Sequence, residues 1–132
     1  MGLFHRSGGY AVFISEIDAE HKTLFRLVEE LRTARRTRHE VLQSIASHLQ
    51  DHFAHEERLM RISRYDALAW HKQQHDGARR QVKWFVKRIE QGDRKAAGEM
   101  TEYLAGWLES HVPVTDRMMA AYLRNFERRQ AA

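Results

Sequence analysis

The sequence predicts an all-α protein, an antiparallel up-down-up-down four-helix bundle with a short N-terminal arm. Its 132 residues include one proline and seven glycines, and long stretches are rich in Ala, Leu, Glu, Arg, Lys and Gln, which favour helices. Four such stretches carry apolar residues at spacings of three and four, the pattern of a helix with one buried face. Short connections between helices favour antiparallel neighbours. We expect one domain over residues 1–132, with the arm at 1–14 and the bundle at 15–128.

The first two expected helices lie between residues 15 and 62. The first follows Ser15, with Asp18 three residues later in a pattern similar to a capping box, and it ends in the basic stretch near Arg36. The second runs from about His39 to Ile62. Their apolar stripes are Ile17, Leu24, Leu27, Val28 and Leu31 in the first helix, and Leu42, Ile45, Leu49, Phe53, Leu59 and Met60 in the second.

The third expected helix starts near Asp66, a residue type that favours the N-cap. Gly92 provides a C-terminal stop, because glycine readily adopts the left-handed conformation that ends a helix. Its apolar stripe consists of Trp70, Val82, Phe85, Val86 and Ile89.

The fourth expected helix begins near Arg94, with Asp93 as a possible cap, and continues past Pro113 to about residue 126. A proline inside a helix costs about 3 kcal/mol or forces a kink. His111 and Asp116 are five residues apart, which is about 140° on a regular helix, so a kink or break is needed if both are to face inward. The apolar stripe is Met100, Leu104, Trp107, Leu108, Met118, Met119, Tyr122, Leu123 and Phe126.

The composition excludes several classes of function. The 22 Lys and Arg residues and 18 Asp and Glu residues give a net charge of +4, but the basic residues are interspersed with Glu and no nucleic-acid motif accompanies them. We therefore expect solvated helix faces and no nucleic-acid binding. No apolar run approaches a membrane span, so no membrane partner is expected. There is no cysteine for a disulfide or a thiolate zinc site. The N-terminal segment lacks a secretory signal pattern, and the expected location is cytoplasmic.

Histidine and acidic residues recur at helical spacings in three places, and a further histidine stands alone in the first helix. Residues four apart share one face of a helix and can converge on one ion. Imidazoles with carboxylates suit a transition metal such as iron, whereas calcium and magnesium prefer oxygen ligands. The candidate ligands are His21, His52, Glu56, His71, His75, His111 and Asp116.

This arrangement resembles the hemerythrin family, specifically its single-domain bacterial members. The matching segments are IDAEHKTL at 17–24, HFAHEERLM at 52–60, HKQQH at 71–75 and WLESHVPVTD at 107–116. The family pattern has the same ligand order and spacings, H, HxxxE, HxxxH and HxxxxD, and the similarity covers about residues 13–123. The resemblance implies reversible binding of dioxygen for storage, delivery or sensing, and no enzymatic activity.

The resemblance also implies a cofactor of two iron ions, a non-haem centre bridged by an oxo or hydroxo group. One iron is expected on His71, His75 and His111, the other on His21 and His52, with Glu56 and Asp116 bridging both. The second iron has one protein ligand fewer and keeps a position open for dioxygen. The expected oxygen pocket consists of Leu24, Phe53, Trp107, Leu108 and Val112. Relatives often have isoleucine where this chain has Val112, so we expect a roomier pocket and faster autoxidation.

Other functions stay open from the sequence alone. The same scaffold could serve a di-iron oxidase, a peroxidase, a nitric-oxide-handling enzyme, or an iron-supply or iron-repair protein. A basic interaction module with an incidental metal is a further alternative, and the oligomeric state is not specified. Outside the ligand pattern, Glu57 is expected to form a surface pair with Arg61, His55 to lie at the edge of the bundle, and His48 to be partly exposed.

Overall fold

The structure is a computed structural model that describes residues 7–33 and 38–131, and within these ranges it contains helices and no strand. A short 3-10 helix, η1, precedes the bundle, and η2 is a turn of π-helix between two α-helices. The elements are η1 (Ser7–Tyr10), α1 (Ser15–Thr33), α2 (Arg38–Ile62), α3 (Leu68–Glu90), α4 (Ala96–Ser110), η2 (His111–Asp116) and α5 (Arg117–Ala131).

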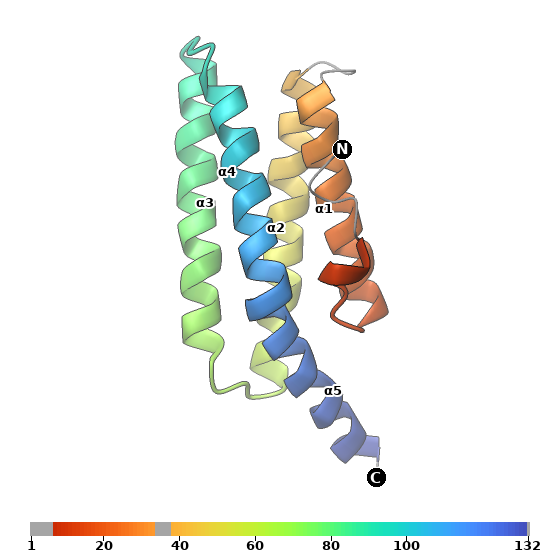
Figure 1. Ribbon diagram of the computed structural model, residues 1–132. Helices are drawn as coiled ribbons and strands as arrows, with labels where there is room; N and C mark the ends of the chain where they lie inside the picture. The colour runs from red at the N-terminus through yellow and green to blue at the C-terminus, as the bar shows by residue number, and fades with distance from the viewer. Residues whose placement is uncertain (1–6, 34–37, 132) are drawn as a thin grey trace.

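The helices α1 to α4 lie side by side as an antiparallel bundle (Figure 1). Around this bundle α1 contacts α2, α2 contacts α3, α3 contacts α4, and α4 contacts α1. The helix that begins as α4 continues through η2 into α5, whose C-terminal end projects beyond the other helices (Figure 1). The predicted fold class, a four-helix bundle, is therefore confirmed.

The apolar stripes form one main core between the four helices, with Phe53, Ile17, Leu24, Ile45 and Met100 among its largest fully buried side chains. Burial of such side chains stabilises the fold by about 1.5–3 kcal/mol each.

Two stripe predictions were wrong, because Trp70 and Met118 are 45% and 51% exposed. Each precedes a buried residue, His71 or Met119, and one residue along a helix turns the side chain about 100° away.

The start of α1 is capped differently from the expected capping box. Ser15 is already the first helical residue, and Asp18 reaches back beyond it. The Asp18 carboxylate accepts hydrogen bonds from the backbone N–H groups of Val12, at 2.8 Å, and Phe13, at 3.1 Å. These bonds fix how the chain enters the helix. The predicted end of this helix near Arg36 lies outside the described residues, and the described part of α1 ends at Thr33.

One prediction about the ends of α3 and α4 is confirmed, the stop at Gly92. Two are corrected, the N-cap of α3 and the first residue of α4. Gly92 has φ +87°, the left-handed conformation expected at the end of α3. Asp66 is not the N-cap of α3, since Ala67 holds that position without a side-chain hydrogen bond. Asp93 accepts a hydrogen bond from the Lys95 N–H at 3.0 Å, and α4 starts at Ala96, two residues later than predicted.

The described part of the N-terminal arm is attached to the end of the bundle that carries η2 and α5. The Arg117 guanidinium donates hydrogen bonds to the carbonyl oxygens of Gly9, at 2.9 Å, and Ala11, at 3.0 Å. The Arg124 guanidinium donates to the carbonyl oxygen of Val12. In the described part of the chain, no helix has a stretch both long and apolar enough to span a bilayer.

Candidate metal centre

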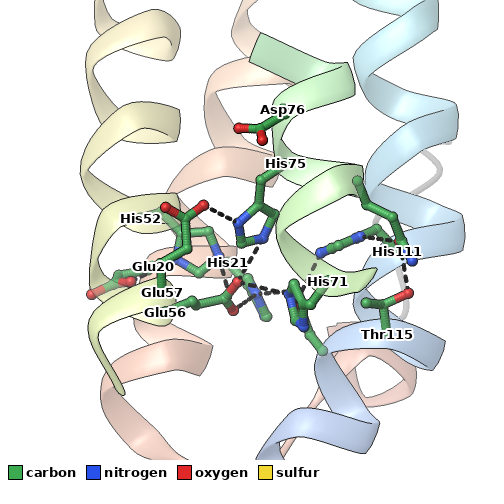
Figure 2. Close-up of polar contacts among 12 residues, drawn as sticks. Glu20, His21, His52, Glu56, Glu57, His71, His75, Asp76, His111 and Thr115 are labelled. Carbon is green, nitrogen blue, oxygen red and sulfur yellow. Dashed lines mark hydrogen bonds and ion pairs between the residues drawn. The ribbon is translucent and has the colours of Figure 1, made fainter. Parts of the chain in front are cut away.

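The seven candidate ligands converge inside the bundle from α1, α2, α3 and η2. Figure 2 labels all of them except Asp116. All seven side chains are buried. Their nitrogen and oxygen atoms form two overlapping groups, within each of which the ligand atoms lie within 4.8 Å of one another. The five-donor group is Glu56, His71, His75, His111 and Asp116, and the four-donor group is His21, His52, Glu56 and Asp116.

The π-helical turn η2 brings Asp116 to the same side as His111. A π-helix is held by hydrogen bonds between residues five apart, so side chains at that spacing stack one above the other. The Arg117 N–H donates to the carbonyl of Val112, five residues back, at the end of this turn. Pro113 lies inside the turn and cannot donate a backbone hydrogen bond of its own. The break predicted between the two ligands is therefore a π turn.

The inward atoms of these ligands approach one another closely without forming hydrogen bonds. Nε2 of His21, His71 and His111 each lies 3.0 Å from an oxygen of Asp116. Nε2 of His75 lies 3.1 Å from Glu56 Oε1. Among the described residues, these four Nε2 atoms and all four carboxylate oxygens have no hydrogen-bond partner. So many unpaired buried polar atoms cost several kcal/mol, and an ion that accepts their lone pairs removes that cost.

The cluster also shifts the protonation of its members. Burial alone would lower the pKa of His52, but the charge of Glu56 and the hydrogen bond with Glu20 raise it to about 10. Burial likewise opposes the protonated form of His71, whose pKa the contacts with the two carboxylates raise to about 9. Burial would raise the pKa of both carboxyl groups, but the surrounding imidazoles lower it. Both carboxylates are therefore ionised at neutral pH, and a metal ion must displace protons from imidazoles.

Three ligand imidazoles are held from outside by a second polar side chain. Nδ1 of His52 lies 2.6 Å from Glu20, and Nδ1 of His75 lies 2.8 Å from Glu57. Nδ1 of His111 lies 2.8 Å from the side-chain oxygen of Gln74. Partners of this kind fix which ring nitrogen faces a metal. Sequence reasoning missed all three.

Glu57 does not form the predicted surface pair with Arg61. Its side chain is buried and accepts hydrogen bonds from the Arg79 guanidinium at 2.8 and 3.2 Å, in addition to its contact with His75. These bonds, and the charge of Arg79, lower the pKa of Glu57 although burial opposes this. The HxxxEE run in the sequence is the one local signal that could have drawn attention to this second carboxylate.

The residues expected to line an oxygen pocket fall into two sets. Phe53 stacks on the imidazole of His75 with ring centroids 4.1 Å apart, and Trp107 stacks on that of His111 at the same separation. Both imidazoles belong to the five-donor group. The other three residues are buried in the main core: Leu24, Leu108 and Val112. Their part in binding oxygen stays a prediction.

Comparison with known proteins adds an independent observation to this geometry. The family model described as "Hemerythrin HHE cation binding domain" matches residues 12–123, most of the chain. The chain belongs to the hemerythrin family. The buried imidazoles and carboxylates of the chain lie inside the matched range and could hold a cation.

The chain is also similar to individual members of the family. It is 31% identical over 107 residues to the Hemerythrin of Themiste dyscrita and 29% identical over 107 residues to the Myohemerythrin of Theromyzon tessulatum. Each alignment covers 81% of this chain and 82% of the relative. The Bacteriohemerythrin of Methylococcus capsulatus is 28% identical over 106 residues, 76% of this chain and 81% of the relative. No solved structure was found to match the chain significantly.

Proposed function

We propose that this protein binds dioxygen reversibly at a non-haem centre of two iron ions and does not turn over a substrate. The observation that carries the proposal is the set of buried, inward-facing nitrogen and oxygen atoms that lack hydrogen-bond partners. Membership of the hemerythrin family and the names of its relatives support the same activity.

The two ligand groups suggest how the ions would be held. The five-donor group would hold one iron through His71, His75 and His111, and the four-donor group would hold the other through His21 and His52. Glu56 and Asp116 belong to both groups and would bridge the ions. When bound, two ferrous ions can supply the two electrons that dioxygen takes up and can recover them when it leaves.

The donor set favours iron over harder cations, because five imidazoles and two carboxylates suit a borderline transition metal. It also favours binding over oxidative turnover. The di-iron proteins of the ferritin-like class use more carboxylates, and their additional negative charge stabilises oxidised metal. Here the neutral donors outnumber the charged ones, which supports a carrier or store over an oxidase.

The chain would contribute a dry, apolar environment around the two ions. The four-donor group offers one protein ligand fewer, as in reactive metal sites that keep a vacancy. Apolar side chains would exclude water from this environment. Water would otherwise promote irreversible oxidation of the iron to the ferric state. We assign this role to Leu24, Phe53, Trp107, Leu108 and Val112, all of which except Trp107 are buried.

The proposal is tested by visible absorption of anaerobically reduced protein whose iron content has been quantified. The protein should contain about two iron ions per chain, as the paired ligand groups imply. It should be nearly colourless, become coloured when air is added, and bleach when the air is purged.

A matched pair of variants controls this experiment. Glu56→Gln removes a carboxylate shared by both groups and should abolish the colour change, whereas Glu40→Gln makes the same replacement at an exposed position of the same helix and should not. Conversion to a coloured form that purging does not reverse would contradict reversible binding and favour the oxidase alternative. Protein reconstituted with iron that retains none would contradict the di-iron centre.

A further inference from the structure

The carboxylate of Glu20 lies between two histidines of α2. Its Oε1 is 2.6 Å from Nδ1 of His52, a member of the four-donor group (Figure 2). Its Oε2 is 2.7 Å from Nδ1 of His55. Glu20 precedes His21 in the sequence, so adjacent residues of α1 contribute a metal ligand and the partner of another ligand. His55 is not a member of either ligand group.

An ionised carboxylate can only accept hydrogen bonds, so the ring nitrogens that face Glu20 must carry the protons. For His52 this assigns the proton to Nδ1. In the neutral ring that can bind a metal ion, Nε2, which points inward and lies 3.3 Å from Glu56 Oε2, is then the nitrogen that carries the lone pair. The contact with Glu20 therefore determines both the tautomer and the ring orientation of His52.

We propose that Glu20 is a positioning residue for His52 and that His55 holds Glu20 in place. The inference rests on the proposed metal centre and adds to it two residues outside the seven ligands. A glutamate side chain with one bonded oxygen can rotate away toward water. The bond from His55 to the second oxygen of Glu20 opposes that rotation.

The surroundings of Glu20 make this restraint necessary. Glu20 is 33% exposed and His55 18% exposed, and both line a surface depression of about 450 Å³ together with His48, Asp51 and Arg58. Water in this depression can compete for the carboxylate. His52 also borders this depression but is only 4% exposed, and it depends on Glu20 for the hydrogen bond at Nδ1.

The restraint matters most for the four-donor group. That group has only two imidazoles, and Nδ1 of its other imidazole, on His21, has no hydrogen-bond partner among the described residues. Glu20 is thus the side chain that fixes an imidazole of this group from outside. In the five-donor group, His75 and His111 have partners of their own in Glu57 and Gln74.

The test uses Zn²⁺ as the probe, in competition with a chromophoric chelator, on the full chain. Glu20→Ala should weaken the zinc ion bound at the four-donor group by about 10- to 100-fold, the usual effect of losing an outer partner. His55→Ala should weaken it by a smaller factor. Glu16→Ala is the matched control, because Glu16 lies one turn away on α1 and 3.9 Å from His55 Nε2 but has no contact with His52. It removes the same charge and should leave zinc affinity unchanged.

A second readout separates positioning from general stability. In the zinc-loaded wild type, nitrogen-15 NMR should show a protonated Nδ1 of His52 that exchanges slowly with water. This protection should be lost in Glu20→Ala and retained in Glu16→Ala. If Glu20→Ala does not fold, Glu20→Gln is compared with Glu16→Gln by the same two measurements.

Two results would overturn the inference while leaving the metal centre intact. One is a Glu20 variant that binds both zinc ions as tightly as the wild type. The other is an equal loss in the Glu16 variant, which would mean that charge alone acts. A wild-type chain that takes up no second zinc ion would instead overturn the proposed metal centre, and this inference with it.

Discussion

Nε2 of His111 lies 3.0 Å from Oδ1 of Asp116, although the two residues are five positions apart on one continuous helix. On a regular α-helix this spacing would turn the second side chain about 140° away from the first. The π turn removes the mismatch, so that six consecutive residues supply two candidate ligands. Such turns are frequent at functional sites.

Asp116→Asn should weaken metal binding at both positions, because Asp116 belongs to both ligand groups. The loss of metal affinity should exceed the factor of about 10 to 100 expected when a side chain that only holds a ligand in place is removed, because here a proposed ligand itself is changed. Competition with a chelator and the metal content of the purified protein measure the effect. Asp51→Asn, an exposed change on α2, is the control. Loss of only one ion in the Asp116 variant would contradict the bridging role.

Phe53→Ala should lower the free energy of unfolding of the metal-free protein by about 3–5 kcal/mol, because it leaves a cavity in the core. Phe53 is fully buried, stacks on His75 and lies beneath the Arg79 guanidinium. Urea unfolding provides the measurement. Phe13→Ala removes a ring that is 70% exposed and should change stability by less than about 0.5 kcal/mol. Equal effects of the two changes would contradict the packing described for Phe53.

The stabilisation gained from bound metal should increase with pH. His52 and His71 have pKa values raised to about 10 and about 9 in the folded metal-free protein, above the about 6.5 of an unfolded chain. The stabilisation that protonation of these two imidazoles contributes is fully present below about pH 6.5 and is lost as the pH rises through about 9 and 10. Metal binding requires imidazoles without these protons.

The increase in Tm on adding zinc should therefore be larger at about pH 9 than at about pH 6. Thermal unfolding followed by circular dichroism measures it for the metal-free and zinc-loaded protein. The Asp116→Asn variant is the control, in which both increases should be small. An increase that is the same at both pH values would show that protons and zinc do not compete for these imidazoles.

Val112→Ile should slow autoxidation of the oxygen-loaded protein, because in the proposed oxygen pocket the additional methylene would fill space and exclude water. Val112 is fully buried, so overpacking can cost about 1–3 kcal/mol. The rate is measured from the visible spectrum over time, with Val114→Ile at an exposed position as the control. An unchanged autoxidation rate in a folded Val112 variant would remove this residue from the pocket.

Asp18→Ala should lower the free energy of unfolding by about 0.5–2 kcal/mol, the usual effect of losing a side-chain cap. Asp18 accepts two backbone hydrogen bonds ahead of α1. Asp66→Ala is a close control, because Asp66 precedes α3 but does not cap it. Urea unfolding of both variants should separate them, and equal losses would show that the described cap is not what stabilises α1.

The fold could be predicted where its signals are local. Apolar periodicity identified the helices, and the left-handed conformation of Gly92 follows from its lack of a side chain. The Asp66 prediction failed because the chain enters α3 through a turn. The Leu68 N–H bonds to the carbonyl of Tyr65, and the His71 N–H bonds to that of Ala67, so Ala67 starts the helix. The preference of a residue type for the N-cap position does not reveal such a turn in the preceding chain.

The candidate site could be predicted in part for the same reason. The types of the candidate ligands and their helical spacing are visible in short stretches of sequence, and the structure brings all seven residues together. The side chains that hold these imidazoles from outside could not be predicted. The pairs Glu20–His52, Glu57–His75 and Gln74–His111 join residues that are 32, 18 and 37 positions apart. Such pairs depend on how neighbouring helices rotate against each other, which periodicity does not determine.

The attachment of the N-terminal arm has a practical consequence for protein engineering. Arg117, the residue after Asp116, is held by the carbonyl groups of Gly9 and Ala11. A bulky affinity tag fused before the arm and displacing it would remove these acceptors one residue away from a candidate metal ligand. The end of α5 projects away from the bundle (Figure 1). Tags and fusion partners are therefore better placed at the C-terminus, where they leave the centre undisturbed.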